Sequence, residues 1–147
     1  MARTFMPTLV LVAVSEAYLL IGRHDDALRF ARRAVEVAGE RGERGTTARA
    51  MRILGEIAAN GDLPDVEQAE RHYRLALPVA HELAMCPLEA HCHLGLGKLY
   101  HRIGQLDRAR AELSRAVEML RDLEMTHWLP EAELVAASGS PAVDRVR

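Results

Sequence analysis

Apolar and small residues recur at helical spacing in three stretches of the chain, 17–37, 56–79 and 98–119. In each stretch a helical pattern ends at a glycine, and a second one begins after a short turn with an acidic residue near its start. Glycine ends a helix at little steric cost, and acidic side chains are favourable at the positive N-terminal end of the next helix. The pattern predicts three helical hairpins and a further helix. The expected helices are 8–21, 25–40, 47–60, 64–84, 88–103, 106–123 and 127–138.

The three stretches align so that small residues share positions 40 to 42 residues apart, the scale of helix-pair solenoids. Small residues at a crossing allow two antiparallel helices to approach closely. The segments 39–47 and 85–89 are expected to link the hairpins. The aligned sets are Ser15, Gly55 and Gly97; Ala27, Ala69 and Ala109; and Ala34, Ala76 and Ala116.

The tetrapeptide Gly95–Lys98, GLGK, has the composition of a phosphate-binding loop. Such a loop requires GxxxxGK followed by Ser or Thr, after a strand and before a helix. Cys92 stands where the first glycine of that motif belongs, Leu99 follows the lysine, and the segment is expected to be mid-helix. We therefore interpret Gly97 as a packing residue and Lys98 as a side chain on the helix surface.

The pattern LGxxY…G…A…A resembles the tetratricopeptide (TPR) repeat, with its best match at Leu96, Gly97, Tyr100, Gly104, Ala109 and Ala116. Its template fits residues 90–123, fits 8–41 with Ser15 in place of glycine, and fits 48–83 with a longer turn. The last part of the chain is also similar to the C-terminal helical repeats of bacterial multidomain regulators that carry a nucleotide cyclase or an AAA-type ATPase. The resemblance implies an all-α fold, a right-handed α-α superhelix, and a bacterial regulatory or signalling setting.

We expect one domain over 8–138, in which helix 127–138 caps the last hairpin, and a flexible tail at 139–147. An open solenoid end has to be covered, which is why a capping helix is expected. The resemblance further implies a concave groove lined by the first helix of each hairpin. The groove candidates are Arg49, Arg52, Glu56, Asn60, His91, Leu94, Lys98, His101 and Arg102. Their mildly basic character suits an acidic or C-terminal peptide, and the alternative is a solvated helix face.

The first helix, 8–21, is apolar on every side, and such a helix is normally buried all round. Its candidate association face consists of Leu9, Val12, Leu19 and Leu20. A second copy, a partner protein or the segment 2–7 folding back would cover it. We expect self-association, as a homodimer, because most soluble oligomers are symmetric assemblies of one chain.

Metal-binding residue types gather at His81, Cys86, His91, Cys92, His93 and His101. On one helix, residues 91 to 93 point about 100° apart in succession and cannot converge on one ion. We therefore expect no metal, no cofactor and no catalytic residue, with Cys92 or His93 packed between helices and His91 facing outward. The arginines at 29, 32 and 33 are interpreted as a solvated outer face.

The totals fit this picture of a protein-binding module. The chain has 147 residues, a net charge of −2 and two cysteines. No global basic field attracts nucleic acid, no segment is long enough to span a membrane, and two cysteines fit a reducing cytoplasm. The leading hypothesis is a non-catalytic protein-interaction module. The alternatives are a homo-oligomerisation scaffold and, less favoured, a metal-dependent enzyme.

Overall fold

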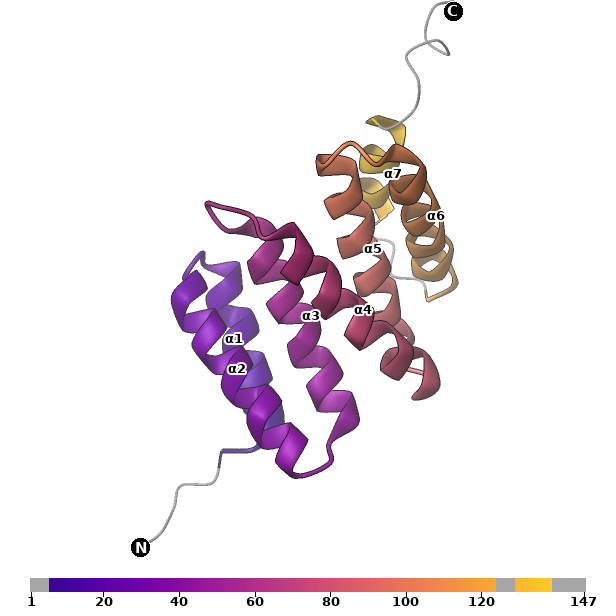
Figure 1. Ribbon diagram of the computed structural model, residues 1–147. Coiled ribbons are helices and arrows are strands. Elements are labelled where there is room, and N and C mark those ends of the chain that lie inside the picture. The colour runs from indigo at the N-terminus through magenta and orange to yellow at the C-terminus, as the bar shows by residue number, and fades with distance from the viewer. Residues whose placement is uncertain (1–5, 124–128, 139–147) are drawn as a thin grey trace, which may run out of the picture. The chain divides into compact units, whose positions relative to one another are not determined.

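The computed structural model describes residues 6–123 and 129–138, which form seven α-helices and no strand (Figure 1). The helices pair as three hairpins, and the all-α class expected from the sequence is confirmed. The expected tail at 139–147, residues 2–5 and the first residues of the capping helix lie outside the described residues. The helices are α1 (Thr8–Leu20), α2 (His24–Glu40), α3 (Arg44–Asn60), α4 (Val66–Glu82), α5 (Cys86–Arg102), α6 (Leu106–Asp122) and α7 (Leu129–Ser138).

The chain divides into two compact units, Met1–Met85 and Cys86–Arg147. In the first unit, α1 packs against α2 and α3, while α3 also packs against α2 and α4 (Figure 1). In the second unit, α5 pairs with α6, and α7 lies mainly against α6. The single domain over 8–138 stays a prediction.

The aligned alanines occupy the centre of each hairpin. Ala27, Ala69 and Ala109, and their counterparts seven residues later, are all fully or almost fully buried. One core cluster of the first unit combines the small residues Ala31, Ala34 and Ala50 with larger ones such as Leu11 and Ile53. The prediction that small residues mark the helix crossings is therefore confirmed.

The Ser15, Gly55 and Gly97 positions are also buried, and each brings two helices together in a different way. Ser15 Oγ donates a hydrogen bond of 2.6 Å to the Ala27 carbonyl oxygen across α1 and α2. A Cβ placed on Gly55 would lie 3.1 Å from the Tyr73 ring, and one placed on Gly97 would lie 2.6 Å from Leu113 Cγ and Cδ2. The GLGK segment is mid-helix in α5, as expected.

Four of the turns share one backbone geometry at the end of a helix. Gly22, Gly42 and Gly104 adopt φ of 79°, 69° and 80°, and Ala84 adopts φ of 53° at the corresponding place. The residue after each donates its backbone N–H to the carbonyl five positions earlier, as Arg23 does to Tyr18 at 2.9 Å. This is the Schellman arrangement, in which a left-handed residue lets the last carbonyls find donors. Gly61 differs, with φ of −68° in a longer turn.

The linkers are shorter than the sequence predicts. The expected linker 39–47 is reduced to Arg41–Glu43, because Gly42 alone makes the turn and Gly39 and Gly45 are accommodated inside helices. The expected linker 85–89 is likewise replaced by the turn 83–85, so that α5 begins at Cys86. Pro87 is tolerated there because the first turn of a helix has no intrahelical partner for its N–H groups.

Candidate functional site

The first helix exposes one apolar stripe and buries the opposite side. Its buried residues, Thr8, Leu11, Val12 and Ser15, face the core that α1 shares with α2 and α3. The large apolar residues on the other side are exposed to the following fractions: Met6 42%, Leu9 59%, Val10 41%, Leu20 82% and Ile21 68%. Leu9, Val10 and Leu20 follow helical spacing with the exposed Ala13 and Ala17 and form one stripe along α1, and Met6 before the helix and Ile21 at its C-cap flank the two ends of this stripe. We call it the α1 stripe.

The expectation for α1 needs a correction at two residues. Val12 is 7% exposed within the core of its own unit, and Leu19 is partly buried against the same core. Val12 is therefore not available to a partner and Leu19 only in part, whereas Leu9 and Leu20 are exposed. The helix is not surrounded on all sides by the described residues. A helical wheel of 6–21 would have separated the two faces, because Ser15 and Thr8 mark the side that packs on α2.

Glu16 is the acidic residue beside the α1 stripe, and it is held by Arg52. Arg52 Nη2 lies 2.9 Å from Glu16 Oε1, and Arg52 Nη1 lies 2.7 Å from Glu56 Oε1. The Arg52 side chain is only 12% exposed, so this cation is already occupied by two carboxylates. Two of the predicted groove residues in α3, Arg52 and Glu56, thus stabilise the contact of α3 with α1.

The other candidates in α3 lie at its surface. Arg49 and Asn60 are both exposed, and Asn60 Nδ2 donates a hydrogen bond of 2.9 Å to the Glu56 backbone oxygen. Near the start of the same helix, Arg44 forms a two-point ion pair with Glu82 of α4, with distances of 2.6 and 3.1 Å. The hydrogen bonds and the positive charge of Arg44 lower the pKa of the Glu82 carboxyl. This pair fastens two helices and leaves Arg49 as the more accessible cation of α3.

In the second unit, the capping helix engages two of the predicted groove residues. Lys98 forms an ion pair with Glu131, and His101 Nε2 lies 3.3 Å from Ser138 Oγ. Leu94 is buried, His91 is partly buried, and Arg102 is exposed. The sequence indicated a capping helix but not that it would reach these side chains.

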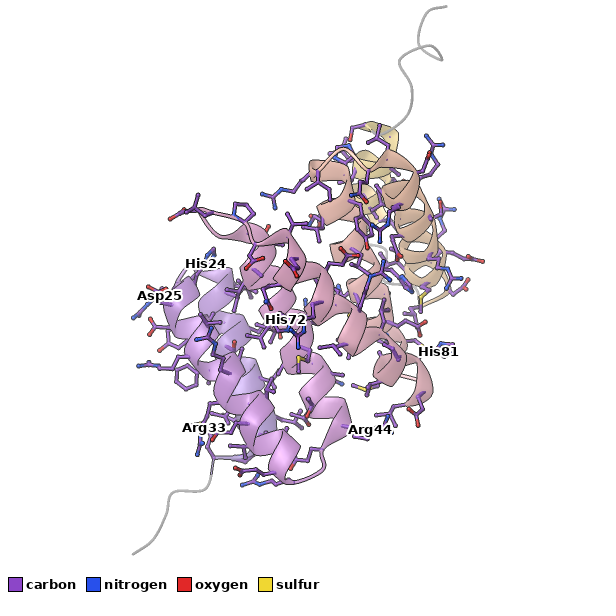
Figure 2. All side chains as sticks on the ribbon, viewed as in Figure 1. His24, Asp25, Arg33, Arg44, His72 and His81 are labelled. Carbon is purple, nitrogen blue, oxygen red and sulfur yellow. The ribbon has the colours of Figure 1, made fainter. Side chains whose placement is uncertain are left out.

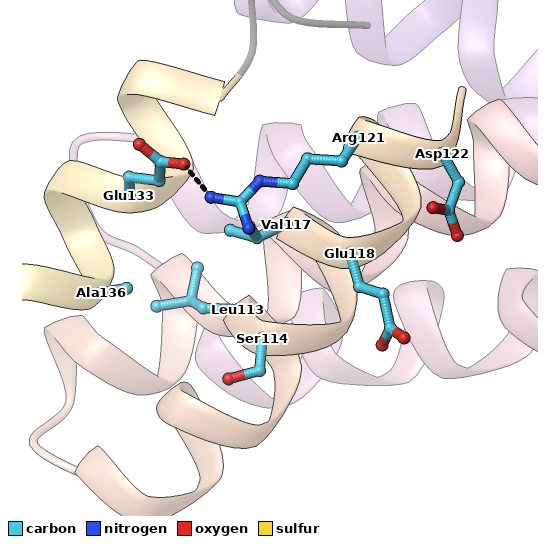
Figure 3. Close-up of a pocket in the computed structure, with 8 residues that line it drawn as sticks. All are labelled: Leu113, Ser114, Val117, Glu118, Arg121, Asp122, Glu133 and Ala136. Carbon is cyan, nitrogen blue, oxygen red and sulfur yellow. Dashed lines mark hydrogen bonds and ion pairs between the residues drawn. The ribbon is translucent and has the colours of Figure 1, made fainter. Parts of the chain in front are cut away.

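A hollow of about 430 Å³ lies between α6 and α7 (Figure 3). Arg121 crosses it to Glu133, with a distance of 2.7 Å between Nη2 and Oε1. Leu113 and Val117 form its apolar part, and Glu118 lies on the same helix face. The Arg121–Glu133 ion pair joins α7 to the last hairpin. We therefore interpret the hollow as the junction between α6 and α7.

The cysteine and histidine residues are separated rather than gathered. Cys92 is fully buried and His93 is 6% exposed, as the packing interpretation predicted. His93 Nδ1 lies 2.6 Å from Glu112 Oε2 of α6, and its Nε2 lies 3.9 Å from Glu89 Oε1. No group of three or more His, Cys, Asp or Glu in the described part of the chain is placed to hold a metal ion. No pattern in the sequence indicated that two carboxylates would lie around His93.

The arrangement of the helices defines the class of protein. Paired antiparallel helices that repeat along the chain, with small residues at each crossing, make a helical repeat protein of the TPR-like kind. Among solved structures the chain is similar to RapI, a TPR-like helical repeat protein described in its apo form, with a TM-score of 0.80 at 18% sequence identity. The match covers 99% of this chain and 52% of the RapI chain, so the chain spans about half the length of RapI. This likeness shows the fold, and it fits the α-α superhelix class.

No protein-family model and no curated protein sequence matches the chain. None of the described helices combines the length and the apolar character needed to cross a bilayer.

Proposed function

We propose that the chain is a non-catalytic protein-binding module of a bacterial regulatory or signalling system, acting in the cytoplasm. The observation that carries the proposal is the α1 stripe, because Leu9, Val10 and Leu20 on one face of the helix, with Met6 and Ile21 just beyond its two ends, are each more than 40% exposed. Contiguous exposed apolar surface of this kind marks an interaction site on soluble proteins. Its helical form suits an apolar face of another protein.

The stripe lies on the side of α1 where a preceding repeat would pack. In a solenoid each repeat buries its faces against its neighbours, and α1 contacts only α2 and α3 among the described helices. A partner helix docking on Leu9 and Leu20 would cover the α1 stripe. The occupant that we favour is a second copy of the chain, which gives a homodimer, and a different protein is the alternative.

The inner face of the first unit, on α3, is the second candidate surface. Arg49 is exposed there, while Arg52 is held by the carboxylates of Glu16 and Glu56. Peptide binding at this surface would therefore depend on Arg49 more than on Arg52. Replacing Arg49 with Gln tests it separately from the α1 stripe.

The first experiment is the solution mass by light scattering over a range of concentrations, for the wild-type chain and two variants. Leu20→Glu places a charge in the stripe, and Leu63→Glu is the matched control because Leu63 is 93% exposed in the α3–α4 turn. A dimer that Leu20→Glu alone dissociates supports the homodimer. A monomer in all three samples refutes self-association. Capture of a protein from lysate by wild type and Leu63→Glu, but not by Leu20→Glu, then supports a different partner, and capture by none refutes binding at the stripe.

A further inference from the structure

The first unit has a hollow on the side formed by the second helices of its hairpins. The first helices, α1 and α3, contact each other, whereas α2 and α4 do not. The opening between α2 and α4 has α3 as its floor and a volume of about 490 Å³, which lies in the range of ligand pockets, roughly 300–1,000 Å³. Its apolar lining comes from two of these helices, with Leu28 and Val35 on α2 and with Met51, Leu54 and Ile57 on α3, while α4 contributes the polar residues Gln68 and His72.

One wall of the hollow carries a polar atom without a partner. Figure 2 shows His72 of α4 over α3, on the side toward α2. Its Nδ1 is hidden from solvent and has no hydrogen-bond partner. Burial of the ring and the charges of Arg71 and Arg32 lower the pKa of His72, which keeps the ring neutral at pH 7. Buried polar atoms are almost always hydrogen-bonded, so this ring orientation leaves Nδ1 unsatisfied, and an orientation in which Nδ1 faces the hollow would let it meet a donor there.

The opposite wall carries a cation without a carboxylate. Arg32 of α2 is exposed and lines the hollow, and it has no ion pair within the described residues. Its neighbours differ: Arg29 pairs with Asp26 at 3.2 Å and Arg33 pairs with Glu36 at 3.1 Å. The nearest acidic group of the lining, Asp65, caps α4 by accepting a hydrogen bond from the Gln68 backbone N–H.

We propose that this hollow binds a short extended segment of a partner protein in which one acidic residue stands between two apolar residues. The lining of α2 runs from residue 28 to 35, two turns or about 10 Å, which three extended residues span. A carboxylate in the middle of such a segment reaches Arg32, and a guanidinium binds a carboxylate through two parallel hydrogen bonds. The flanking apolar side chains cover Met51 and Leu54.

His72 completes the recognition of the segment. Rotation of its ring about χ2, a broad and roughly twofold torsion, turns Nδ1 toward the opening. In the neutral ring that nitrogen accepts a hydrogen bond from a backbone N–H of the segment. The site uses none of the residues of the α1 stripe or of the inner face, so it can succeed or fail independently of the function proposed above.

The test is a titration of the full chain, labelled with ¹⁵N, with acetyl-Leu-Glu-Leu-amide and with its Gln analogue. We expect the Glu peptide to shift the amide signals of Met51 and Leu54 and the ring signals of His72, and to bind at least about tenfold more tightly than the Gln peptide. Arg32→Gln should reduce binding of the Glu peptide to the level of the Gln peptide. Arg33→Gln is the matched control and should change nothing, because Arg33 is also exposed on α2 but does not line the hollow.

Three results would overturn the proposal: no shifts at the hollow, equal binding of the two peptides, or an Arg32→Gln variant that binds as wild type does. Arg32 is exposed, so its replacement leaves the core intact, and Arg32→Lys should retain part of the preference for the Glu peptide. If the hollow instead holds a second copy of the chain, the solution mass will fall on Arg32→Gln while the peptides cause no shift, and this also contradicts the proposal. Leu20→Glu should leave peptide binding unchanged.

Discussion

Replacing Gly97 with Ala tests whether the second unit depends on the closeness of α5 and α6. A Cβ at Gly97 would lie 2.6 Å from both Cγ and Cδ2 of Leu113 and 3.3 Å from the Leu113 backbone nitrogen. Leu113 is 1% exposed, so its side chain has little space into which to move. Overpacking of a close-packed interior costs about 1–3 kcal/mol. A value near the upper end is expected because the clash includes backbone.

A gain partly offsets this cost. Alanine is better than glycine in a helix interior by about 1 kcal/mol. The expected net loss in the free energy of unfolding of Gly97→Ala is therefore about 1–2 kcal/mol, measured by urea denaturation followed by far-UV circular dichroism. Gly39→Ala is the control for the gain alone, because Gly39 is in a helix and nothing lies within 4 Å of its added Cβ.

A double-mutant cycle isolates the clash. Leu113→Ala alone should cost about 2–5 kcal/mol through the cavity that it leaves. In that background Gly97→Ala no longer meets Cγ and Cδ2, so its effect should change from destabilising to neutral or stabilising. The reasoning is refuted if Gly97→Ala raises the free energy of unfolding in the wild-type background as Gly39→Ala does. It is also refuted if the two substitutions are additive, since residues in contact should couple.

Three further predictions concern a turn, a titrating group and the first helix. Ala84→Gly should raise the free energy of unfolding by about 1 kcal/mol, because φ of 53° is strained for alanine. Gly42→Ala should lower the free energy of unfolding by about as much, because it places alanine at a φ of 69°. The denaturant midpoints of the two variants check both signs. His72 has a lowered pKa in the folded protein, so the unfolded chain binds more protons just below its unfolded pKa, near 6.5. Its contribution to stability is thus complete above that pH and is lost as the pH falls from there toward the folded value, and His72→Gln should flatten the pH dependence of the thermal midpoint in this window. Val12→Glu should unfold the first unit, because the residue is buried, whereas Leu20→Glu should retain the helical circular dichroism signal; equal loss of signal in both variants would contradict the assignment of the two faces.

The sequence predicted the hairpins because small residues at a helix crossing leave a visible pattern. Ala27, Ala69 and Ala109 share a position, and the glycines at 22 and 104 mark where helices end, so the elements and their pairing followed from local rules. The turn at Ala84 was expected too late in the chain, at 85–89, because alanine is not the residue that a left-handed position favours. The packing of the two flanking helices imposes a left-handed backbone on Ala84 against the preference of alanine. The propensity of a single residue does not reveal such a constraint.

The candidate site was less accessible to sequence reasoning. Side chains were assigned to a groove from their positions on a template, but Arg52 and Lys98 are engaged by Glu16 and Glu131, which are 36 and 33 residues away. Such pairs depend on how helices are placed beside one another, and no periodicity in the sequence encodes them. The α1 stripe could have been derived from spacing, since Leu9 and Leu20 lie on one side of the helix and Val12 on the other.

The three solutions at Ser15, Gly55 and Gly97 have a consequence for how this sequence can change over time. In the first hairpin the Ser15 hydroxyl donates to the Ala27 carbonyl. In the second the Tyr73 ring packs against Gly55, and in the third Leu113 packs against Gly97. The requirement at this position is the distance between two helices and not one particular residue. Several residue pairs meet that requirement. Hairpins built on such interchangeable pairs can change in sequence until their residues no longer align, while the helix arrangement stays the same. Exchanging the helices of one hairpin for those of another would bring mismatched pairs together. The same rule shows how two chains can share this fold with few identical residues, as this chain and RapI do at 18% identity over 99% of this chain.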